Sequence, residues 1–261
     1  MGQIITIANQ KGGVGKTTTA INLAAGLAAA EKNVLLLDAD PQANATSGLG
    51  IDKNSIEYSL YQFLLQDLPL HQVAHETALA RLYVVPANQD LIGAEVELID
   101  LPGRQTLLAR KLKPLVEKFD YIIIDSPPSL QLMTINSLSA AHAVLIPLQC
   151  EYYALEGLTQ IIRAVALIRR RYNPTLDIMG ILLTMFDTRN RLSHQVADEV
   201  HEHFPDRVFE TVIPRNVRLS ESPSHGLPII LYDIRSSGAE AYLALTNEVL
   251  KKNAKTSPEN N

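Results

Sequence analysis

The chain lacks several features that would place it in a specialised class of protein. It has a single cysteine, Cys150, and no tryptophan among its 261 residues. One cysteine cannot form an intramolecular disulfide, nor can it build a cysteine-based zinc or iron–sulfur site within one chain. No apolar run approaches the roughly 20 residues that cross a bilayer. These absences exclude a disulfide scaffold, a single-chain cysteine cluster and a transmembrane helix.

An excess of basic charge is also missing. The formal net charge is -5, while 46% of the residues are hydrophobic and 20% are charged. This balance is typical of a folded chain with a sizeable core, and it argues against a surface coated with basic residues. The first residues lead directly into an apolar run and show no basic segment or cleavage site of a signal peptide. We therefore expect a cytoplasmic protein.

Arginines nevertheless gather in one part of the chain. Residues 160–191 contain more arginines than acidic residues, which are two aspartates in this range. The arginines are Arg163, Arg169, Arg170, Arg171, Arg189 and Arg191. The run 169–171 is typical of the end of a helix, where cations interact favourably with the helix dipole. It is equally compatible with a surface that binds a polyanion. The sequence leaves both interpretations open.

Apolar runs without alternation indicate strands that are buried on both faces, and they alternate with helical patterns. The runs occupy residues 4–7, 34–37, 121–124, 143–146 and 178–183. Apolar residues three and four apart predict helices over residues 17–30, 104–119, 155–172, 192–204 and 238–252. This order predicts an α/β fold with a mostly parallel, twisted sheet of about seven or eight strands and helices on both faces.

The organisation along the chain indicates one domain. Residues 1–252 are expected to form it, and the polar tail 253–261 is expected to fray. Residues 45–97 are less regular and are interpreted as an insertion, with a helix around 60–65 and a short strand at 82–85. Cys150 is expected to be a small core residue. Tyr152 and Tyr153, which begin a helix, are expected to be packing residues rather than a stacking platform.

A glycine-rich loop follows the first strand and precedes the first helix. Its sequence is Gln10-Lys11-Gly12-Gly13-Val14-Gly15-Lys16-Thr17-Thr18. Such a loop turns successive backbone N–H groups into one concavity at a helix N-terminus, which binds phosphate. Lys16 is placed to reach the outer phosphates, and Thr17 to offer its hydroxyl to magnesium. Gln10 stands where the generic P-loop has glycine and is followed by a second lysine, which marks a variant subclass.

Acidic residues follow two further strands. Asp38 and Asp40 close the second apolar run, and Asp125 closes the third. Ligands of doubly wound sheets gather at these strand ends. Asp125 suits the outer shell of Mg²⁺. Asp40 is expected to orient or activate the attacking water, because phosphoryl transfer depends mainly on positioning and charge stabilisation.

Together these motifs resemble the ParA (Soj) family of chromosome and plasmid partitioning ATPases, within the deviant Walker A (MinD/ParA) superfamily. The resemblance rests on residues 11–18, 38–42 with 44–50, 125–128 and 213–223, and it covers essentially residues 3–250. It implies a P-loop ATPase that uses ATP and Mg²⁺ and forms a homodimer with ATP. Lys11 of one subunit would reach the phosphates of the other.

The resemblance also implies partners. Family members bind DNA nonspecifically as ATP dimers, and a ParB (Spo0J)-type partner stimulates hydrolysis, so we expect association with the nucleoid. Arg189 and Arg218 are the main predicted DNA contacts, since both are expected on exposed connections. For Arg218 a structural role, bonding to carbonyls or Glu221, is the alternative. Met185, Pro214 and Arg215 are assigned to the base.

Two other functions stay open. A MinD-like positioning ATPase would attach to membranes by a C-terminal amphipathic helix, but the three lysines after residue 250 have no bulky apolar partner beyond Leu250. We therefore expect no stable membrane association. The second alternative is an ATP-driven scaffold that positions a non-DNA cargo. The nitrogenase iron protein, which has a similar loop, is excluded because one cysteine cannot supply two cluster ligands per subunit.

Overall fold

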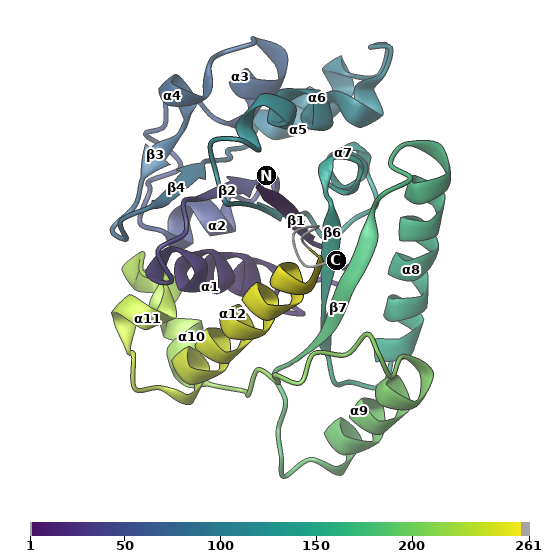
Figure 1. Cartoon of the computed structure of the whole chain (residues 1–261). Helices are drawn as coiled ribbons and strands as arrows, with labels where there is room; N and C mark the ends of the chain where they lie inside the picture. The colour runs from purple at the N-terminus through teal and green to yellow at the C-terminus, as the bar shows by residue number, and fades with distance from the viewer. Residues whose placement is uncertain (1, 257–261) are drawn as a thin grey trace.

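The computed structural model describes residues 2–256. Across this part of the chain one sheet of seven strands runs through the molecule in the order β3-β4-β2-β5-β1-β6-β7 (Figure 1). Every neighbouring pair is parallel except β3 and β4. The strands are β1 (Gln3–Ile7), β2 (Val34–Asp38), β3 (His75–Glu76), β4 (Leu82–Val85), β5 (Tyr121–Asp125), β6 (Ala143–Gln149) and β7 (Asp177–Thr184). The predicted fold class is confirmed.

Helices cover both faces of the sheet (Figure 1). One face packs against α1 (Lys16–Ala29), α2 (Asn44–Gly48), α10 (Val217–Glu221), α11 (Ile229–Tyr232) and α12 (Ser237–Thr256). The other packs against α3 (Leu60–Leu65), α4 (Leu70–Val73), α5 (Asp90–Glu97), α6 (Leu107–Leu112), α7 (Leu132–Ala140), α8 (Ala154–Arg171) and α9 (Arg191–His203). Short 3₁₀ turns are η1 (Arg104–Thr106), η2 (Lys113–Leu115) and η3 (Ser222–His225).

The continuous apolar runs of the strands fill two cores. Successive side chains of a strand point to opposite faces, so Ile4 packs in one core and Ile5 and Ile7 pack in the other. Leu35 and Leu36 of β2 separate in the same way. Both faces must therefore be apolar, which explains why these strands show no alternation.

Two helices differ from the sequence expectations. The helix predicted over residues 104–119 is broken into η1, α6 and η2, because Pro114 cannot donate the backbone hydrogen bond that a continuing helix needs. The last helix continues beyond Lys252 to Thr256. The remainder of the expected tail, residues 257–261, lies outside the described residues. The segment 45–97 contributes β4 and β3 to the sheet, and α3 and β4 occur where they were predicted.

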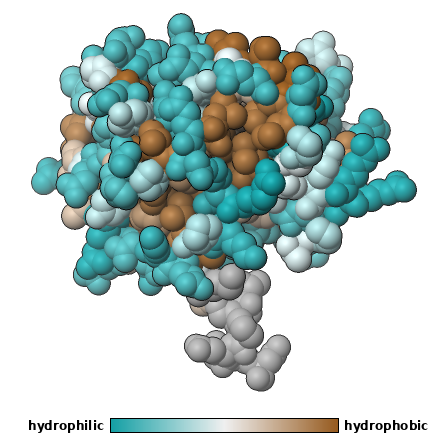
Figure 2. Space-filling model, turned by 90° about the horizontal axis from the view of Figure 1, so that it is seen from above, coloured by the Kyte–Doolittle hydropathy of each residue, from teal (hydrophilic) through white to brown (hydrophobic). Residues whose placement is uncertain are grey.

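Apolar surface gathers on the side that carries α3, α5 and α6, where hydrophilic residues border it (Figure 2). The exposed large apolar side chains of α5 and the turn that follows it are Ile92, Val96, Ile99 and Leu101. Contiguous apolar surface with a polar rim is typical of a contact surface. Within residues 2–256, no helix combines the length and the apolar character that crossing a membrane requires.

The topology brings the sequence motifs to one edge. Strands β1, β2, β5, β6 and β7 are parallel, so their carboxyl ends meet at the same edge of the sheet. The glycine-rich loop follows β1, and the two acidic motifs close β2 and β5, its nearest neighbours on one side. This edge is the position at which open α/β sheets bind ligands.

Candidate nucleotide-binding site

The glycine-rich loop joins β1 to α1 in the conformation that its sequence predicts. Gly13 and Gly15 have φ angles of 76° and 87°, in the left-handed region that favours glycine. Gly15 is the N-cap of α1 and offers no side-chain cap to the first turn. The N–H groups of the first turn of an α-helix have no partner within the helix, and in other P-loops these groups bind phosphate.

Lys16 is the first residue of α1 and lies folded against this loop. Its ammonium group donates a hydrogen bond of 3.0 Å to the carbonyl oxygen of Lys11, and the residue is only 7% exposed. Burial lowers the pKa of Lys16, while the carboxylates of Asp125 and Asp40 oppose that shift. A buried ammonium with one carbonyl partner retains two donors for a polyanion.

Asp125 is the most unusual polar group at the site. It is fully buried, and neither carboxylate oxygen has a hydrogen-bond partner among the described residues. Burial raises its pKa well above the ordinary value, and the neighbouring Asp38 adds to the shift. The hydroxyl of Thr17 and the ammonium of Lys16 lower the pKa, although Thr17 does not reach hydrogen-bond geometry. Because an unpartnered buried carboxylate is costly, these residues fit a divalent cation nearby.

Asp38 and Asp40 differ in what they contact. The carboxylate of Asp38 accepts hydrogen bonds from the N–H and the hydroxyl of Thr46, at 2.8 and 2.7 Å. Burial raises the pKa of Asp38 to about 6, against these hydrogen bonds. Asp40 accepts one hydrogen bond, of 2.9 Å, from the N–H of Gln42. Asp38 therefore organises the turn into α2, whereas Asp40 has fewer hydrogen-bond partners among the described residues.

Lys11 has a partner that the sequence did not indicate. Its ammonium group forms an ion pair of 2.6 Å with Glu151, in the loop between β6 and α8. Its backbone N–H donates to the side chain of Asn9, whose amide in turn donates to the carbonyl of Pro147. Because β1 and β6 are adjacent, the two loops lie side by side, which no spacing between residues 11 and 151 could reveal.

The residues assigned to the base line one cavity together with the phosphate loop. It has a volume of about 370 Å³. Its lining comprises Gly15, Thr18, Thr184, Met185, Ile213, Pro214, Arg215, Asn216, Leu219, Ser220, Pro223 and Tyr242. Met185 has a φ of 50°, a left-handed conformation that is uncommon outside glycine. The structure thus brings Met185, Pro214 and Arg215 next to Gly15 and Thr18.

Two residues of this cavity were missed by the sequence analysis as site residues. Thr184 ends β7, and its hydroxyl donates to the carbonyl of Val14, which ties the phosphate loop to that strand. Asn216 caps α10 by accepting from the N–H of Leu219, and its amide donates to Ser237 at 2.7 Å. Two sequence features could have indicated them: Thr184 is a polar residue at the end of an apolar run, and Asn216 is of a type that favours helix N-caps.

Arg189 lies apart from the cavity, on the connection between β7 and α9. Its side chain is 88% exposed, and its guanidinium makes two hydrogen bonds of 3.0 Å to the carboxylate of Asp187. The other arginines of this region are exposed as well, and Arg169, Arg170 and Arg171 form the last turn of α8. The helix-end interpretation of that run is therefore correct, and the run remains accessible to a ligand.

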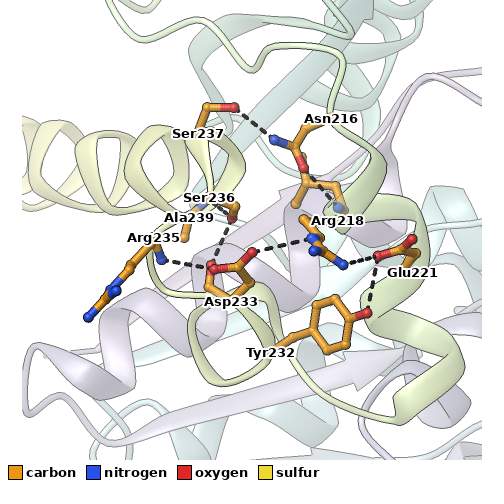
Figure 3. Close-up of polar contacts among 10 residues, drawn as sticks. Asn216, Arg218, Glu221, Tyr232, Asp233, Arg235, Ser236, Ser237 and Ala239 are labelled. Atoms are coloured by element: carbon orange, nitrogen blue, oxygen red, sulfur yellow. Dashed lines mark hydrogen bonds and ion pairs between the residues drawn. The ribbon is translucent and has the colours of Figure 1, made fainter.

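Arg218 belongs to a polar network beside the cavity (Figure 3). Its guanidinium meets Glu221 at 2.9 Å and Asp233 at 3.3 Å. The hydroxyl of Tyr232 donates to the same carboxylate of Glu221 at 3.1 Å. The network joins α10 to α11 and to the turn before α12. The structural role that the sequence left open for Arg218 is present.

The burial that the sequence predicted for Cys150 is confirmed, but the burial predicted for Tyr152 and Tyr153 is wrong. Cys150 is buried, as expected. Tyr152 and Tyr153 are not packing residues, because 79% and 65% of their surfaces are exposed. They stand in the loop before α8, where nothing packs over them among the described residues, and the apolar character of the helix start concealed this from the sequence.

Comparison with known proteins gives close relatives. A family model described as an AAA domain matches residues 2–178. The chain is 57% identical to the chromosome partitioning protein ParA of Myxococcus xanthus over 258 residues, which cover 99% of this chain and 91% of that protein. It is 55% identical to the sporulation initiation inhibitor protein Soj of Bacillus subtilis over 249 residues, which cover 95% and 98%.

Solved structures resemble it over nearly the same extent. A cobyrinic acid a,c-diamide synthase of Mycobacterium smegmatis, solved with an ATP analogue and magnesium, superposes with a TM-score of 0.86 at 36% identity. The match covers 98% of this chain and 97% of that one. The fold of that protein, which was solved with an ATP analogue and magnesium, is thus shared over nearly the whole of this chain.

Proposed function

Because the chain belongs to the ParA/Soj family of chromosome-partitioning ATPases, we propose that it is an ATP-dependent dimerisation switch that binds DNA nonspecifically. Hydrolysis of ATP to ADP and phosphate, stimulated by a ParB-type partner, would separate the dimer and release the DNA. Repeated binding and release would drive the segregation of a chromosome or plasmid. The protein would then be found on the nucleoid while ATP is bound.

One observation carries the nucleotide part of this proposal. Asp125, a buried carboxylate without a partner among the described residues, lies beside the buried ammonium of Lys16, at the start of a helix whose first turn has no side-chain cap. Together the three features form a site for a polyphosphate and a divalent cation. Thr17, Asp40 and Asp125 would hold Mg²⁺, which neutralises phosphate charge when bound. Met185, Pro214 and Arg215 would contact the base.

Three residues of this chain would have separate roles in binding and hydrolysing ATP. Lys16 binds the outer phosphates of its own subunit's nucleotide, and its low exposure keeps that interaction strong. Asp40 accepts one hydrogen bond among the described residues, which leaves it able to orient the attacking water. Lys11 leaves Glu151 and reaches the phosphates of the partner subunit, so that the catalytic site is complete only in the dimer.

DNA binding would use Arg189 and Arg218. Both guanidiniums pair with carboxylates at the surface. Exposed ion pairs contribute little to stability, so a DNA phosphate can replace the carboxylate. Arg218 would give up contacts to two carboxylates, whereas Arg189 would give up one. Arg189 is therefore expected to be the stronger contact.

The experiment compares retention of the purified chain on DNA-coated and lipid-coated beads, with ATP, with ADP and without nucleotide. Retention on DNA with ATP alone is the expected result, and Lys16→Ala serves as the control that loses it. Retention on lipid would favour a MinD-like positioning ATPase. Retention on neither surface, with ATP dimers present, would favour a scaffold for a non-DNA cargo.

A further inference from the structure

The middle of the phosphate loop has little of the chain packed around it. A Cβ added at Gly12 or Gly13 would meet no atom of a non-adjacent residue within 4 Å. Glycine also restricts the backbone less than any other residue does. A ligand binds more tightly to a loop that already has its bound conformation, because less conformational freedom is lost. Whatever holds this loop therefore bears on how well it binds phosphate.

Two hydrogen bonds hold the start of the loop. The N–H of Lys11 donates to the side-chain oxygen of Asn9 at 3.0 Å. The ammonium group of Lys16 donates to the carbonyl oxygen of Lys11, also at 3.0 Å. Both bonds fix the backbone of Lys11, and neither reaches Val14 or Gly15, where the loop enters α1.

Thr184 holds this other end of the loop. It is the last residue of β7 and is 2% exposed, and its hydroxyl donates to the carbonyl oxygen of Val14 at 2.9 Å. Its Cβ and Cγ2 are also the nearest atoms, at 3.9 Å, to a Cβ added at Gly15. Strand β6 lies between β1 and β7, so this hydroxyl joins the loop after β1 to a strand that does not pair with β1.

We infer that Thr184 is a positioning residue for the phosphates of the nucleotide and that it acts through the backbone of the phosphate loop. The carbonyl of Val14 and the N–H of Gly15 belong to one planar trans peptide unit, in which they point in opposite directions. A hydroxyl that holds the carbonyl of Val14 therefore also aims the N–H of Gly15 away from Thr184. Backbone N–H groups of such loops are the groups that bind phosphate.

This role deepens the proposed function and rests on it, since it requires the loop to bind a polyphosphate. The next residue, Met185, lines the cavity assigned to the base. One turn at the end of β7 thus touches the site twice, through the hydroxyl of Thr184 at the phosphate loop and through Met185 at the base. A test must separate these two contacts.

Thr184→Val removes the hydroxyl and keeps a β-branched side chain. Its affinity for ADP with Mg²⁺, measured by calorimetry, should fall about five- to tenfold, as expected when one hydrogen bond no longer holds the loop. Thr184→Ser keeps the hydroxyl and should bind ADP like the parent chain. If Thr184→Val does not fold, Thr184→Ala takes its place, because it removes the hydroxyl without setting a methyl group against the carbonyl of Val14.

Thr6→Val is the matched control. Thr6 is a buried threonine of β1, and its hydroxyl also donates at 2.9 Å to a backbone carbonyl, that of Ser137 in α7. Both valine variants lose one buried hydrogen bond, so their midpoints of urea unfolding should decrease by similar amounts. Only Thr184→Val should lose affinity for ADP.

Two fragments of the nucleotide show which contact Thr184 controls. Inorganic tripolyphosphate and adenosine are each measured by displacement of ADP. In Thr184→Val the affinity for tripolyphosphate should fall by about the factor found for ADP, and the affinity for adenosine should not change. A loss for adenosine as large as the loss for tripolyphosphate, or larger, would overturn the inference, because Thr184 would then act on the base through Met185 or on the whole cavity.

The same measurements separate the possible failures. If the parent chain binds neither ADP nor ATP, the proposed function fails and this inference fails with it. If the parent chain binds ADP while Thr184→Val loses only stability, as Thr6→Val does, the inference alone is overturned. A Thr184→Ser variant that binds ADP as weakly as Thr184→Val would also overturn it, because the hydroxyl would not be the cause.

Discussion

Lys11 and Lys16 share one loop but have different surroundings. Lys16 is buried over the site, whereas Lys11 is partly exposed and pairs with Glu151. Lys16→Ala should abolish nucleotide binding, because the phosphates lose their nearest countercharge. Lys11→Ala should bind ATP as a monomer but neither dimerise nor hydrolyse it. Equilibrium nucleotide binding and gel filtration test both expectations, and normal ATP dimers of the Lys11 variant would contradict the role across the dimer.

Substitution of Asp38 should mainly lower stability, whereas substitution of Asp40 should mainly slow ATP hydrolysis. Asp38→Ala should lower the free energy of unfolding by about 1–3 kcal/mol, because the buried N–H and hydroxyl of Thr46 lose their acceptor. Asp40→Ala should fold normally and hydrolyse ATP at least about 10²-fold more slowly, since it loses the carboxylate that we propose positions the water. Urea unfolding and phosphate release measure the two effects.

Asp38→Asn is the control for this pair of variants, because an amide oxygen can still accept from Thr46 without a charge. Asp38→Asn should therefore lose less stability, relative to the parent chain, than Asp38→Ala does. Normal turnover by Asp40→Ala, combined with a well-folded but inactive Asp38→Ala, would show that the two carboxylates have exchanged roles.

At the scale of elements, the packing of α1 against α12 depends on a glycine. A Cβ added to Gly26 would lie 2.1 Å from the hydroxyl oxygen of Thr246. Helix propensity alone favours alanine by up to about 1 kcal/mol. Overpacking costs about 1–3 kcal/mol and should outweigh it. Gly26→Ala should therefore lower the free energy of unfolding, measured in urea.

A second substitution tests that explanation. Adding Thr246→Ala to Gly26→Ala removes the hydroxyl and methyl groups that the new Cβ would meet. The double variant should regain part of the lost stability, so the two changes should not be additive. Additive losses would mean that Gly26 is needed for a reason other than this contact.

At the scale of the whole molecule, a net charge of -5 opposes binding to DNA. A monomer with a small basic patch should bind weakly, whereas the proposed ATP dimer would present two patches as one polyvalent site. Removing one phosphate contact per subunit removes two per dimer. On duplex DNA, Arg189→Ala should therefore flatten the logarithmic dependence of affinity on salt by about 2, without altering sequence preference.

Salt titrations with nonhydrolysing dimers on unrelated duplexes measure this slope. Arg218→Ala tests the second predicted contact, and its loss also opens the network with Glu221 and Asp233, so nucleotide binding must be measured beside it. Unchanged slopes for both variants, with dimerisation intact, would place the DNA surface elsewhere.

The sequence by itself determined the fold class and the chemistry of the phosphate loop. Strands buried on both faces need continuous apolar runs, and a phosphate loop needs glycines where φ is positive, so both leave a local pattern. Gly13, Gly15 and the position of Lys16 at the start of α1 could be predicted for this reason. Pro114, which breaks a predicted helix, was also visible but was overridden by the apolar spacing around it.

Only the tertiary structure decided which groups meet across the sheet. The ion pair of Lys11 with Glu151, the hydrogen bonds of Thr46 to Asp38 and the network of Arg218 with Asp233 join residues whose spacing carries no periodic signal. The exposure of Tyr152 and Tyr153 was decided in the same way. Burial and ion pairing depend on which strands become neighbours, and the order of strands in a sheet differs from their order in the chain.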